Sequence, residues 1–98
     1  MKARLLVRQR IEVHAFAFAE LVIWQLPVPL KGSVHRFKYR LAYVVDGVCV
    51  LRYDNEAGKG DHRHLGQIET DYAFSSPRQL MADFFGDIQR YNHEHADD

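Results

Sequence analysis

The fold is decided by residues 35–54, HRFKYRLAYVVDGVCVLRYD, in which two alternating apolar segments flank the dipeptide Asp46-Gly47. Asp-Gly in this setting favours a two-residue turn, because both turn positions require positive φ angles that these residue types tolerate. The stretch therefore predicts an antiparallel hairpin, with one strand before the dipeptide and one after it.

The turn also sets an expected register for the hairpin. An unbroken ladder in which Val45 faces Val48 would place Leu41 opposite Arg52. Directly opposed side chains in an antiparallel pair lie about 5 Å apart and interact. In this register the end near the turn is apolar on both faces, and the open end is polar on both. We therefore expect ionisable side chains to gather at the open end.

The residues before the hairpin predict two more strands. Residues 3–13 alternate between apolar and polar side chains, which is the pattern of a half-buried strand. Residues 15–26 are apolar at both parities, which is typical of a strand covered on both faces. Pro27 and Pro29 end this strand, because proline lacks the N–H that a sheet ladder needs.

The C-terminal third predicts a helix that starts at Ser76-Pro77, with Ser as the N-cap and Pro at the first helical position. The following apolar residues form one stripe at helical spacing: Leu80, Met81, Phe84, Phe85, Ile88 and Tyr91. Residues 65–74 would allow a short fifth strand, and residues 93–98 resemble a frayed tail. We therefore predict a single α+β domain over residues 1–98. It would have a curved, mostly antiparallel sheet of four or five strands and one C-terminal helix on one face.

Composition is that of an ordinary globular protein, with 98 residues of which 47% are hydrophobic and 27% charged. No apolar run approaches the ~20 residues of a membrane span. The N-terminus lacks the apolar block and cleavage site of a secretory signal. The single cysteine, Cys49, lies in an apolar segment and is interpreted as a buried thiol. These features favour a cytoplasmic protein.

Charge is unevenly distributed, although the formal net charge is zero. Residues 1–64 hold eleven Lys or Arg and six Asp or Glu, whereas residues 65–98 hold two and seven. This asymmetry permits a basic face for a polyanion, and two solvated faces of opposite sign would explain it equally well. One helix covers only one sheet face, while the central strands are apolar on two. The apolar surface that the helix leaves uncovered predicts a homodimer or a protein partner, unless the curvature of the sheet buries that surface.

Ionisable residues concentrate in residues 52–64, RYDNEAGKGDHRH. A connector that only turned the chain would need little besides Asn, Gly or Pro, so we predict a functional loop over residues 58–64. The candidate catalytic residues are Arg52, Asp54, Lys59, Asp61, His62 and His64. The candidate nucleic-acid contacts are Arg36, Lys38, Tyr39, Arg40, Tyr53 and Arg63.

This set of residues suits phosphodiester chemistry on RNA. Arg and Lys neutralise phosphate oxygens, and histidine exchanges protons near neutral pH. Cleavage through the 2′-hydroxyl of RNA needs a base, an acid and charge stabilisation but no metal or other cofactor. Tyrosine rings such as those of Tyr39 and Tyr53 could stack a base.

Two other interpretations remain open. The spacing His62-X-His64 would place both imidazoles on one side of an extended segment, and Asp54, Asp61 or His35 could complete a metal site. Alternatively the cluster is structural, with Asp54 paired to an arginine and the glycines present only to allow positive φ angles. Gly58 and Gly60 around Lys59 do not form a P-loop, because no Ser or Thr follows the lysine.

Three segments also resemble a known family, namely HRFKYRL at 35–41, RYDNEAGKGDHRH at 52–64 and FSSPRQL at 74–80. They are similar to small bacterial and archaeal proteins that include the TumE-type toxins of toxin–antitoxin pairs. The resemblance covers roughly residues 20–90 and implies a cytosolic toxin that a cognate antitoxin binds and silences. RNA cleavage enters by analogy with other small toxins. We therefore predict a metal-independent endoribonuclease toxin, with a non-catalytic nucleic-acid- or protein-binding module as the alternative.

Overall fold

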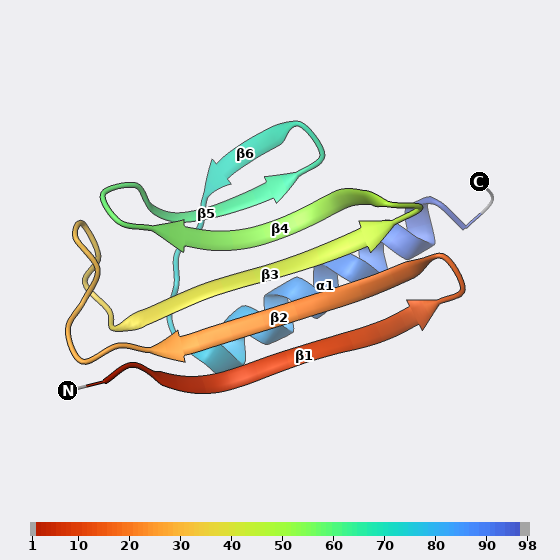
Figure 1. Ribbon diagram of the computed structural model, residues 1–98. Helices are drawn as coiled ribbons and strands as arrows, with labels where there is room; N and C mark the ends of the chain where they lie inside the picture. Colours follow the sequence, from red (N-terminus) through yellow and green to blue (C-terminus); the bar gives the residue numbers. More distant parts are fainter. Residues whose placement is uncertain (1, 97–98) are drawn as a thin grey trace.

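The computed structural model describes residues 2–96, which form a six-stranded sheet with one helix against it (Figure 1). The elements are β1 (Arg4–His14), β2 (Ala17–Gln25), β3 (Phe37–Val45), β4 (Val48–Glu56), β5 (Gly60–Leu65), β6 (Ile68–Asp71) and α1 (Pro77–Glu94). Each strand pairs antiparallel with the next, in the order β1-β2-β3-β4-β5-β6. The α+β class and the C-terminal helix are confirmed, but the expected number of strands was too small.

The extra strand comes from the segment that was predicted to be a loop. Only residues 57–59 form the connection, and β5 begins at Gly60. Gly58 and Gly60 have φ angles of 81° and 79°, so they supply the positive φ that this tight turn needs. The Gly58 N–H also donates to the carbonyl of Lys31 at 2.6 Å, which ties the turn to the loop after β2. His62 and His64 therefore lie on a strand and not in a loop.

The Asp46-Gly47 turn is confirmed, with φ angles of 51° and 78°. The expected register is wrong beyond the first two pairs. Val44 pairs with Cys49 but Tyr43 pairs with Leu51, so an irregularity lies between these pairs and Val50 has no opposite partner. An extra residue of this kind is a β-bulge, and it reverses the face to which all later side chains of β4 point.

The bulge decides which β4 side chains meet the core. Leu41 pairs with Tyr53, whereas Arg52 pairs with Ala42 and not with Leu41. The face covered by α1, here called the helix face, carries these buried side chains: Ala17, Ala19, Leu21, Ile23, Tyr39, Leu41, Tyr43, Leu51 and Tyr53. The opposite face, here called the open face, carries Val22 and Trp24 of β2 together with these polar side chains: Lys38, Arg40, Arg52, Asp54, His62 and His64.

Helix α1 begins as predicted and packs on the centre of the sheet. The Ser76 hydroxyl accepts a hydrogen bond from the Gln79 N–H at 3.1 Å, which caps the first turn. Leu80, Phe84 and Ile88 are at most 4% exposed and contact the core. Burial of each such side chain stabilises the fold by about 1.5–3 kcal/mol.

Two smaller expectations concern Cys49 and the tail. Cys49 is exposed and not buried, because it lies one residue after the start of β4, beside the turn. Its thiol donates to the Leu51 carbonyl at 3.4 Å. Helix α1 extends to Glu94, so the predicted frayed tail is helical at its start, and residues 97–98 lie outside the described residues. No helix in the described part of the chain is long and apolar enough to cross a membrane.

Candidate functional site

The strand geometry of β5 divides the ionisable cluster between the two faces of the sheet. Side chains alternate along a strand, so His62 and His64 share one face while Asp61 and Arg63 share the other. His62 pairs with Asp54 and His64 pairs with Arg52, which places both histidines on the open face. The expectation that the two imidazoles share a side is therefore correct.

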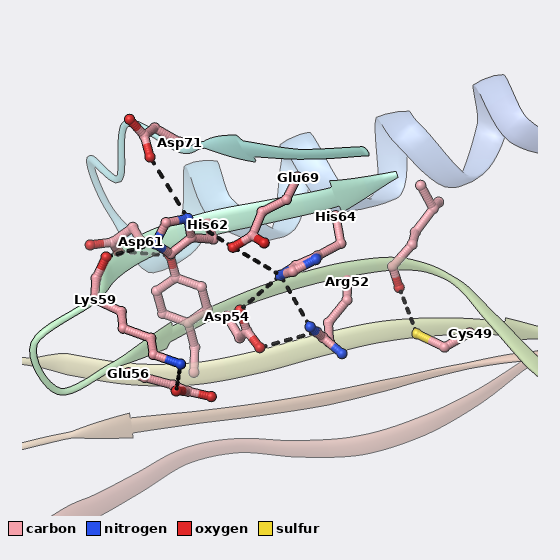
Figure 2. Close-up of polar contacts among 12 residues, drawn as sticks. Cys49, Arg52, Asp54, Glu56, Lys59, Asp61, His62, His64, Glu69 and Asp71 are labelled. Atoms are coloured by element: carbon pink, nitrogen blue, oxygen red, sulfur yellow. Dashed lines mark hydrogen bonds and ion pairs between the residues drawn. The ribbon is translucent and has the colours of Figure 1, made fainter. Parts of the chain in front are cut away.

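A compact group of side chains surrounds the two histidines on β4, β5 and β6, and Figure 2 shows how they point toward one another. We call this group the histidine cluster, and its members are Arg52, Asp54, His62, His64 and Glu69. The four side chains of β4 and β5 are between 18% and 34% exposed, so the site is accessible but not fully hydrated.

His64 accepts a hydrogen bond through Nε2. This atom lies 3.1 Å from Nη2 of Arg52, and a guanidinium carries only donors, so the ring nitrogen must be the acceptor. The same Nε2 lies 3.7 Å from Asp54 Oδ1 and 3.7 Å from Glu69 Oε1. While the Arg52 contact is kept, Nε2 of His64 carries no proton, and its single lone pair accepts from the guanidinium.

His62 has the opposite arrangement. Its Nε2 lies 2.6 Å from the carbonyl oxygen of Lys59, and a carbonyl can only accept, so this nitrogen donates. Its Nδ1 lies 3.3 Å from Glu69 Oε1 and 3.7 Å from Asp71 Oδ1. The two imidazoles thus differ in the hydrogen bond that their Nε2 makes, since His64 accepts from a guanidinium and His62 donates to a carbonyl.

Arg52 retains unused hydrogen-bonding capacity. Its Nε lies 3.1 Å from Asp54 Oδ2 as an ion pair, but the geometry does not make a hydrogen bond. Within residues 2–96, Arg52 Nε is the buried side-chain nitrogen or oxygen that lacks a hydrogen-bond partner. A buried donor without an acceptor is costly, and Arg52 Nε has that cost in this arrangement.

Two hollows lie side by side on the open face. A hollow of about 200 Å³ covers the histidine cluster, and Glu56 and Lys59, which pair at 3.4 Å, form part of its rim. A second hollow of about 330 Å³ shares Arg52, Asp54 and Glu56 with the first. It extends across β3 to β2, where Trp24 forms part of its wall.

Asp61 lies apart from the histidine cluster, on the other face. Its Oδ2 accepts from the Tyr39 hydroxyl at 2.7 Å and contacts His35 Nε2 at 2.8 Å. His35 Nδ1 accepts from the Phe37 N–H at 3.1 Å, so both ring nitrogens of His35 are engaged. Burial, and then the bond to Asp61, raise the pKa of the Tyr39 hydroxyl far above its usual range. This group therefore fastens the loop before β3 to β5.

The side chains of Arg63 and Tyr53 also have a structural role, because both bond to Asp87 of α1. The Tyr53 hydroxyl donates to Asp87 Oδ2 at 2.5 Å, and Arg63 Nε donates to the same oxygen at 2.8 Å. Burial alone would raise the pKa of Asp87, but bonds from Arg63 and then Tyr53 outweigh it and lower that pKa. Burial, followed by the bond to Asp87, raises the pKa of Tyr53.

The expectation of base stacking on tyrosine is not compatible with the structure. Tyr39 is 3% exposed and Tyr53 is 2% exposed, and both rings lie in the core under α1. The reason is the bulge in β4, which turns Tyr53 toward the helix, together with the parity of β3. A base cannot reach either ring without opening the core.

Most of the chain matches one known protein family. The family model described as Toxin TumE matches residues 2–92. This chain belongs to the TumE toxin family. No curated protein and no solved structure matches it. Membership of this family of toxins implies a cognate antitoxin as a partner, and it confirms the resemblance seen in the sequence.

In this member of the TumE family, the basic residues of β3 lie beside the histidine cluster. Lys38 and Arg40 are exposed on the open face, and Arg40 pairs with Asp54. Arg36 is exposed immediately before β3. Of the twelve predicted site residues, eight are thus open-face or exposed: Arg36, Lys38, Arg40, Arg52, Asp54, Lys59, His62 and His64.

Sequence reasoning missed several open-face residues of this TumE-family toxin. Glu69 and Asp71 approach the histidines because β6 pairs with β5, and β6 was only an ambiguous segment in the sequence. Trp24 was counted among the apolar residues of the second strand. Its even parity, shared with Val22, was the available signal that it lies away from the core.

The metal-site interpretation finds no complete ligand set. Within residues 2–96, no group of three or more His, Cys, Asp or Glu side chains is arranged to hold a metal ion. His62 and His64 do share a face, but Asp61 and His35 point to the helix face and contact each other. They are therefore not available to complete a site with the two histidines.

Proposed function

We propose that this TumE-family toxin acts on RNA as a metal-independent endoribonuclease, with the histidine cluster as its catalytic centre. The observation that carries the proposal is the pair of imidazoles on one face of β5, one accepting from Arg52 and the other donating to the Lys59 carbonyl. Cleavage of RNA through its own 2′-hydroxyl needs a base and an acid placed in this way, together with a fixed cation.

The hydrogen-bond partners favour a specific division of roles. His64 is the general base, because its Nε2 lone pair can take the proton of the 2′-hydroxyl. The 2′-oxygen then bonds to phosphorus, and the bond from phosphorus to the 5′-oxygen breaks. His62 is the general acid in its imidazolium form, with Nδ1–H facing Glu69, and it gives its Nε2 proton to that departing oxygen and becomes neutral. The products are a 2′,3′-cyclic phosphate and a new 5′-hydroxyl.

Cations beside the histidines stabilise the charge that develops on phosphorus. Arg52 Nη2 lies 3.1 Å from His64 Nε2, so this donor can bind a phosphate oxygen once the substrate hydroxyl replaces it at His64. Lys59 is exposed at the rim, and within residues 2–96 its ammonium pairs with Glu56 alone. Asp54 contacts both Arg52 and His64 and is a positioning residue. Asp61 takes no part in this proposal, because its contacts lie on the helix face.

A growth and cleavage experiment tests the proposal. Wild type, His62→Ala and His64→Ala are induced in bacteria, and total RNA is followed together with cleavage by the purified proteins. We expect growth arrest and RNA fragments with cyclic phosphate ends from wild type. Each alanine variant should lose about 10²–10⁴-fold in cleavage rate while still binding RNA.

The matched control is His93→Ala, which removes an exposed histidine from the end of α1. It should arrest growth as wild type does. Equal cleavage by wild type and His64→Ala would overturn the assignment of the catalytic centre.

A non-catalytic binding module is the second candidate, and one observation favours it. Each ionisable side chain of the histidine cluster contacts at least one other member. Three carboxylates line the same hollow, namely Asp54, Glu56 and Glu69. A surface of this kind suits recognition as well as turnover. RNA binding that weakens steeply with salt, without any cleavage, would support the module.

Two other expectations stay proposals that follow from the same site. The cytoplasm is the compartment in which a toxin directed at RNA would act. A homodimer would cover the open face that α1 leaves uncovered, in competition with the antitoxin. Sedimentation of the purified toxin, alone and with its antitoxin, separates these two assemblies.

A further inference from the structure

We propose that the hollow around Trp24 is a subsite for one nucleotide of single-stranded RNA. The base would stack on the indole ring, and Lys38 and Arg40 would contact the adjacent phosphate. The inference rests on the proposed action on RNA, because it names the part of the substrate that this second hollow binds. Lys38 and Arg40 were already predicted from the sequence as nucleic-acid contacts, but neither the sequence nor the family match assigns Trp24 to the site.

The register of the sheet creates the subsite. Trp24 pairs with Lys38, and Val22 pairs with Arg40, so two apolar side chains of β2 lie directly beside two basic side chains of β3. Paired residues on neighbouring strands have Cβ atoms about 5 Å apart. A flat aromatic surface is therefore flanked along one side by two positive charges, which matches the chemistry of a base and its phosphate.

The side chains of Lys38 and Arg40 have no protein partner in the described part of the chain. Neither Lys38 nor Arg40 makes a side-chain hydrogen bond or ion pair within residues 2–96, and both are exposed. Two other open-face arginines are engaged, and the first of them, Arg10, lies 3.8 Å from the centre of the Phe18 ring and 3.7 Å from Glu20. Arg52 is paired with Asp54. Charges without partners can bind phosphate without first breaking an internal contact.

The size of the hollow sets a limit on its ligand. Its volume of about 330 Å³ is near the lower end of the ~300–1,000 Å³ typical of small-molecule sites. One nucleoside fits this space, whereas a duplex does not. Asp54 and Glu56 line the hollow from β4, on the far side of β3 from Trp24, so the neutral base is expected over Trp24 on β2 and the phosphate beside Lys38 and Arg40 on β3.

The subsite is continuous with the histidine cluster. Both hollows share Arg52, and Arg40 pairs with Asp54, which in turn pairs with His62. Three strand spacings separate β2 from β5, a distance of about 14 Å. A base on Trp24 therefore belongs to a nucleotide near the cleaved bond but not at it. Such a contact would position the strand and contribute to sequence preference.

The chain supplies its own reporter for a test, because Trp24 is the single tryptophan. Full-length His64→Ala toxin is titrated with a single-stranded RNA oligonucleotide of eight nucleotides and with an RNA duplex, while indole fluorescence is recorded. We expect quenching by the single strand and little change with the duplex. With the same oligonucleotide carrying a fluorescent label and its anisotropy as the readout, Trp24→Leu should weaken single-strand affinity by about 5- to 150-fold, the value of one base stack, and Trp24→Phe should restore most of it.

The basic residues are tested against a matched charge removal. Lys38→Ala and Arg40→Ala should each weaken RNA binding. Each should also reduce the slope of log K against log salt concentration by about the value of one phosphate contact. Arg78→Ala removes the same charge from an exposed position on α1 and should bind as the parent does. Circular dichroism of each variant checks that the sheet is intact.

The outcomes separate this subsite from the proposed catalytic function. The subsite is wrong, while cleavage by the histidines stands, if bound RNA leaves the fluorescence unchanged. It is also wrong if Trp24→Leu binds RNA as its His64→Ala parent does and, with His64 restored, cleaves as wild type does. If RNA quenches Trp24 but wild type never cleaves, the subsite stands and the catalytic proposal fails. Quenching that depends on protein concentration alone would mean that a second copy covers Trp24, and this too would overturn the subsite.

Discussion

Arg63 and His64 are consecutive residues whose side chains serve opposite faces of the sheet. Arg63 Nε donates to Asp87 Oδ2 at 2.8 Å and so joins β5 to α1. His64 Nε2 accepts from Arg52 at 3.1 Å on the open face. One step along the strand thus divides a structural ion pair from a candidate catalytic group, and substitutions at the two positions should have different consequences.

Arg63→Ala should destabilise the fold, whereas His64→Ala should not. Removal of Arg63 leaves the carboxylate of Asp87, which is 7% exposed, without its strongest partner. The expected loss is about 1.5–3 kcal/mol in the free energy of unfolding, the contribution of a hydrogen bond to a charged group. Urea denaturation measures it, with Arg78→Ala as the surface control. Equal losses for Arg63→Ala and His64→Ala would contradict the division between the faces.

Acid should weaken the fold through Asp87. The pKa of this carboxyl is lowered in the folded state, because the bonds from Arg63 and Tyr53 outweigh the opposing effect of burial. A lowered pKa gives stability that is present above the unfolded value of about 3.9 and is lost as the pH falls through the folded value.

Asp87→Asn should therefore be less stable at pH 7, and its stability should change less than that of wild type between pH 5 and pH 2. Denaturation curves across this range provide the measurement. Asp46→Asn, at the exposed hairpin turn, is the control and should keep the steeper dependence. A parallel acid dependence in wild type and Asp87→Asn would show that other carboxyls carry it.

The elements that could be predicted are those fixed by local chemistry. The turn at Asp46-Gly47, the cap at Ser76 and the alternation of β1 depend on neighbouring residues alone. The bulge at Val50 could not be predicted, since no glycine marks it and it depends on how the core packs. That single extra residue reversed the faces of Arg52 and Tyr53, and so it decided which residues form the site.

The candidate site was found as a set but not as an arrangement. The density of ionisable residues over 52–64 located it, and the spacing of His62 and His64 placed them on one side. Side chains do not alternate between two faces in a loop as they do along a strand. The loop interpretation therefore could not predict that His62 and Asp61 lie on opposite faces of the sheet. Glu69 contacts both histidines because β6 pairs with β5. Residues 52–64 alone do not predict this pairing, because Glu69 lies outside them.

Alkali should weaken the fold through Tyr39. Burial, and then the hydrogen bond to Asp61, raise the pKa of this hydroxyl far above its usual range. A raised pKa gives stability that is fully present below the unfolded value of about 10 and is lost as the pH rises toward the folded value.

Tyr39→Phe should therefore show a smaller fall in stability between pH 9 and pH 11 than wild type does. Some fall will remain, because Tyr53 and Tyr72 are shifted in the same direction. Tyr91→Phe, on the outer part of the α1 stripe, is the control. An unchanged alkaline dependence in Tyr39→Phe would mean that the bond to Asp61 contributes little.

Chelation should leave RNA cleavage unchanged. The proposed reaction uses ring nitrogens that already have partners, the Lys59 carbonyl for His62 and the Arg52 guanidinium for His64. Cleavage is compared before and after dialysis against EDTA, with the fold checked by circular dichroism. Loss of cleavage that Zn²⁺ or Mn²⁺ restores would instead favour a metal site on His62 and His64.

Glu69→Gln should reduce cleavage without loss of RNA binding. The Glu69 carboxylate lies 3.3 Å from His62 Nδ1 and 3.7 Å from His64 Nε2, so it orients both rings from the edge of the sheet. Glutamine keeps the shape but not the charge, and a positioning residue should affect the rate by less than the 10²–10⁴-fold of a general acid or base. We expect a fall in kcat of about tenfold with KM little changed. Thr70→Ala, at the neighbouring position on the other face of β6, controls for damage to the strand. Equal kcat values in wild type and Glu69→Gln would remove this carboxylate from the mechanism, and a large rise in KM would place it in RNA binding instead.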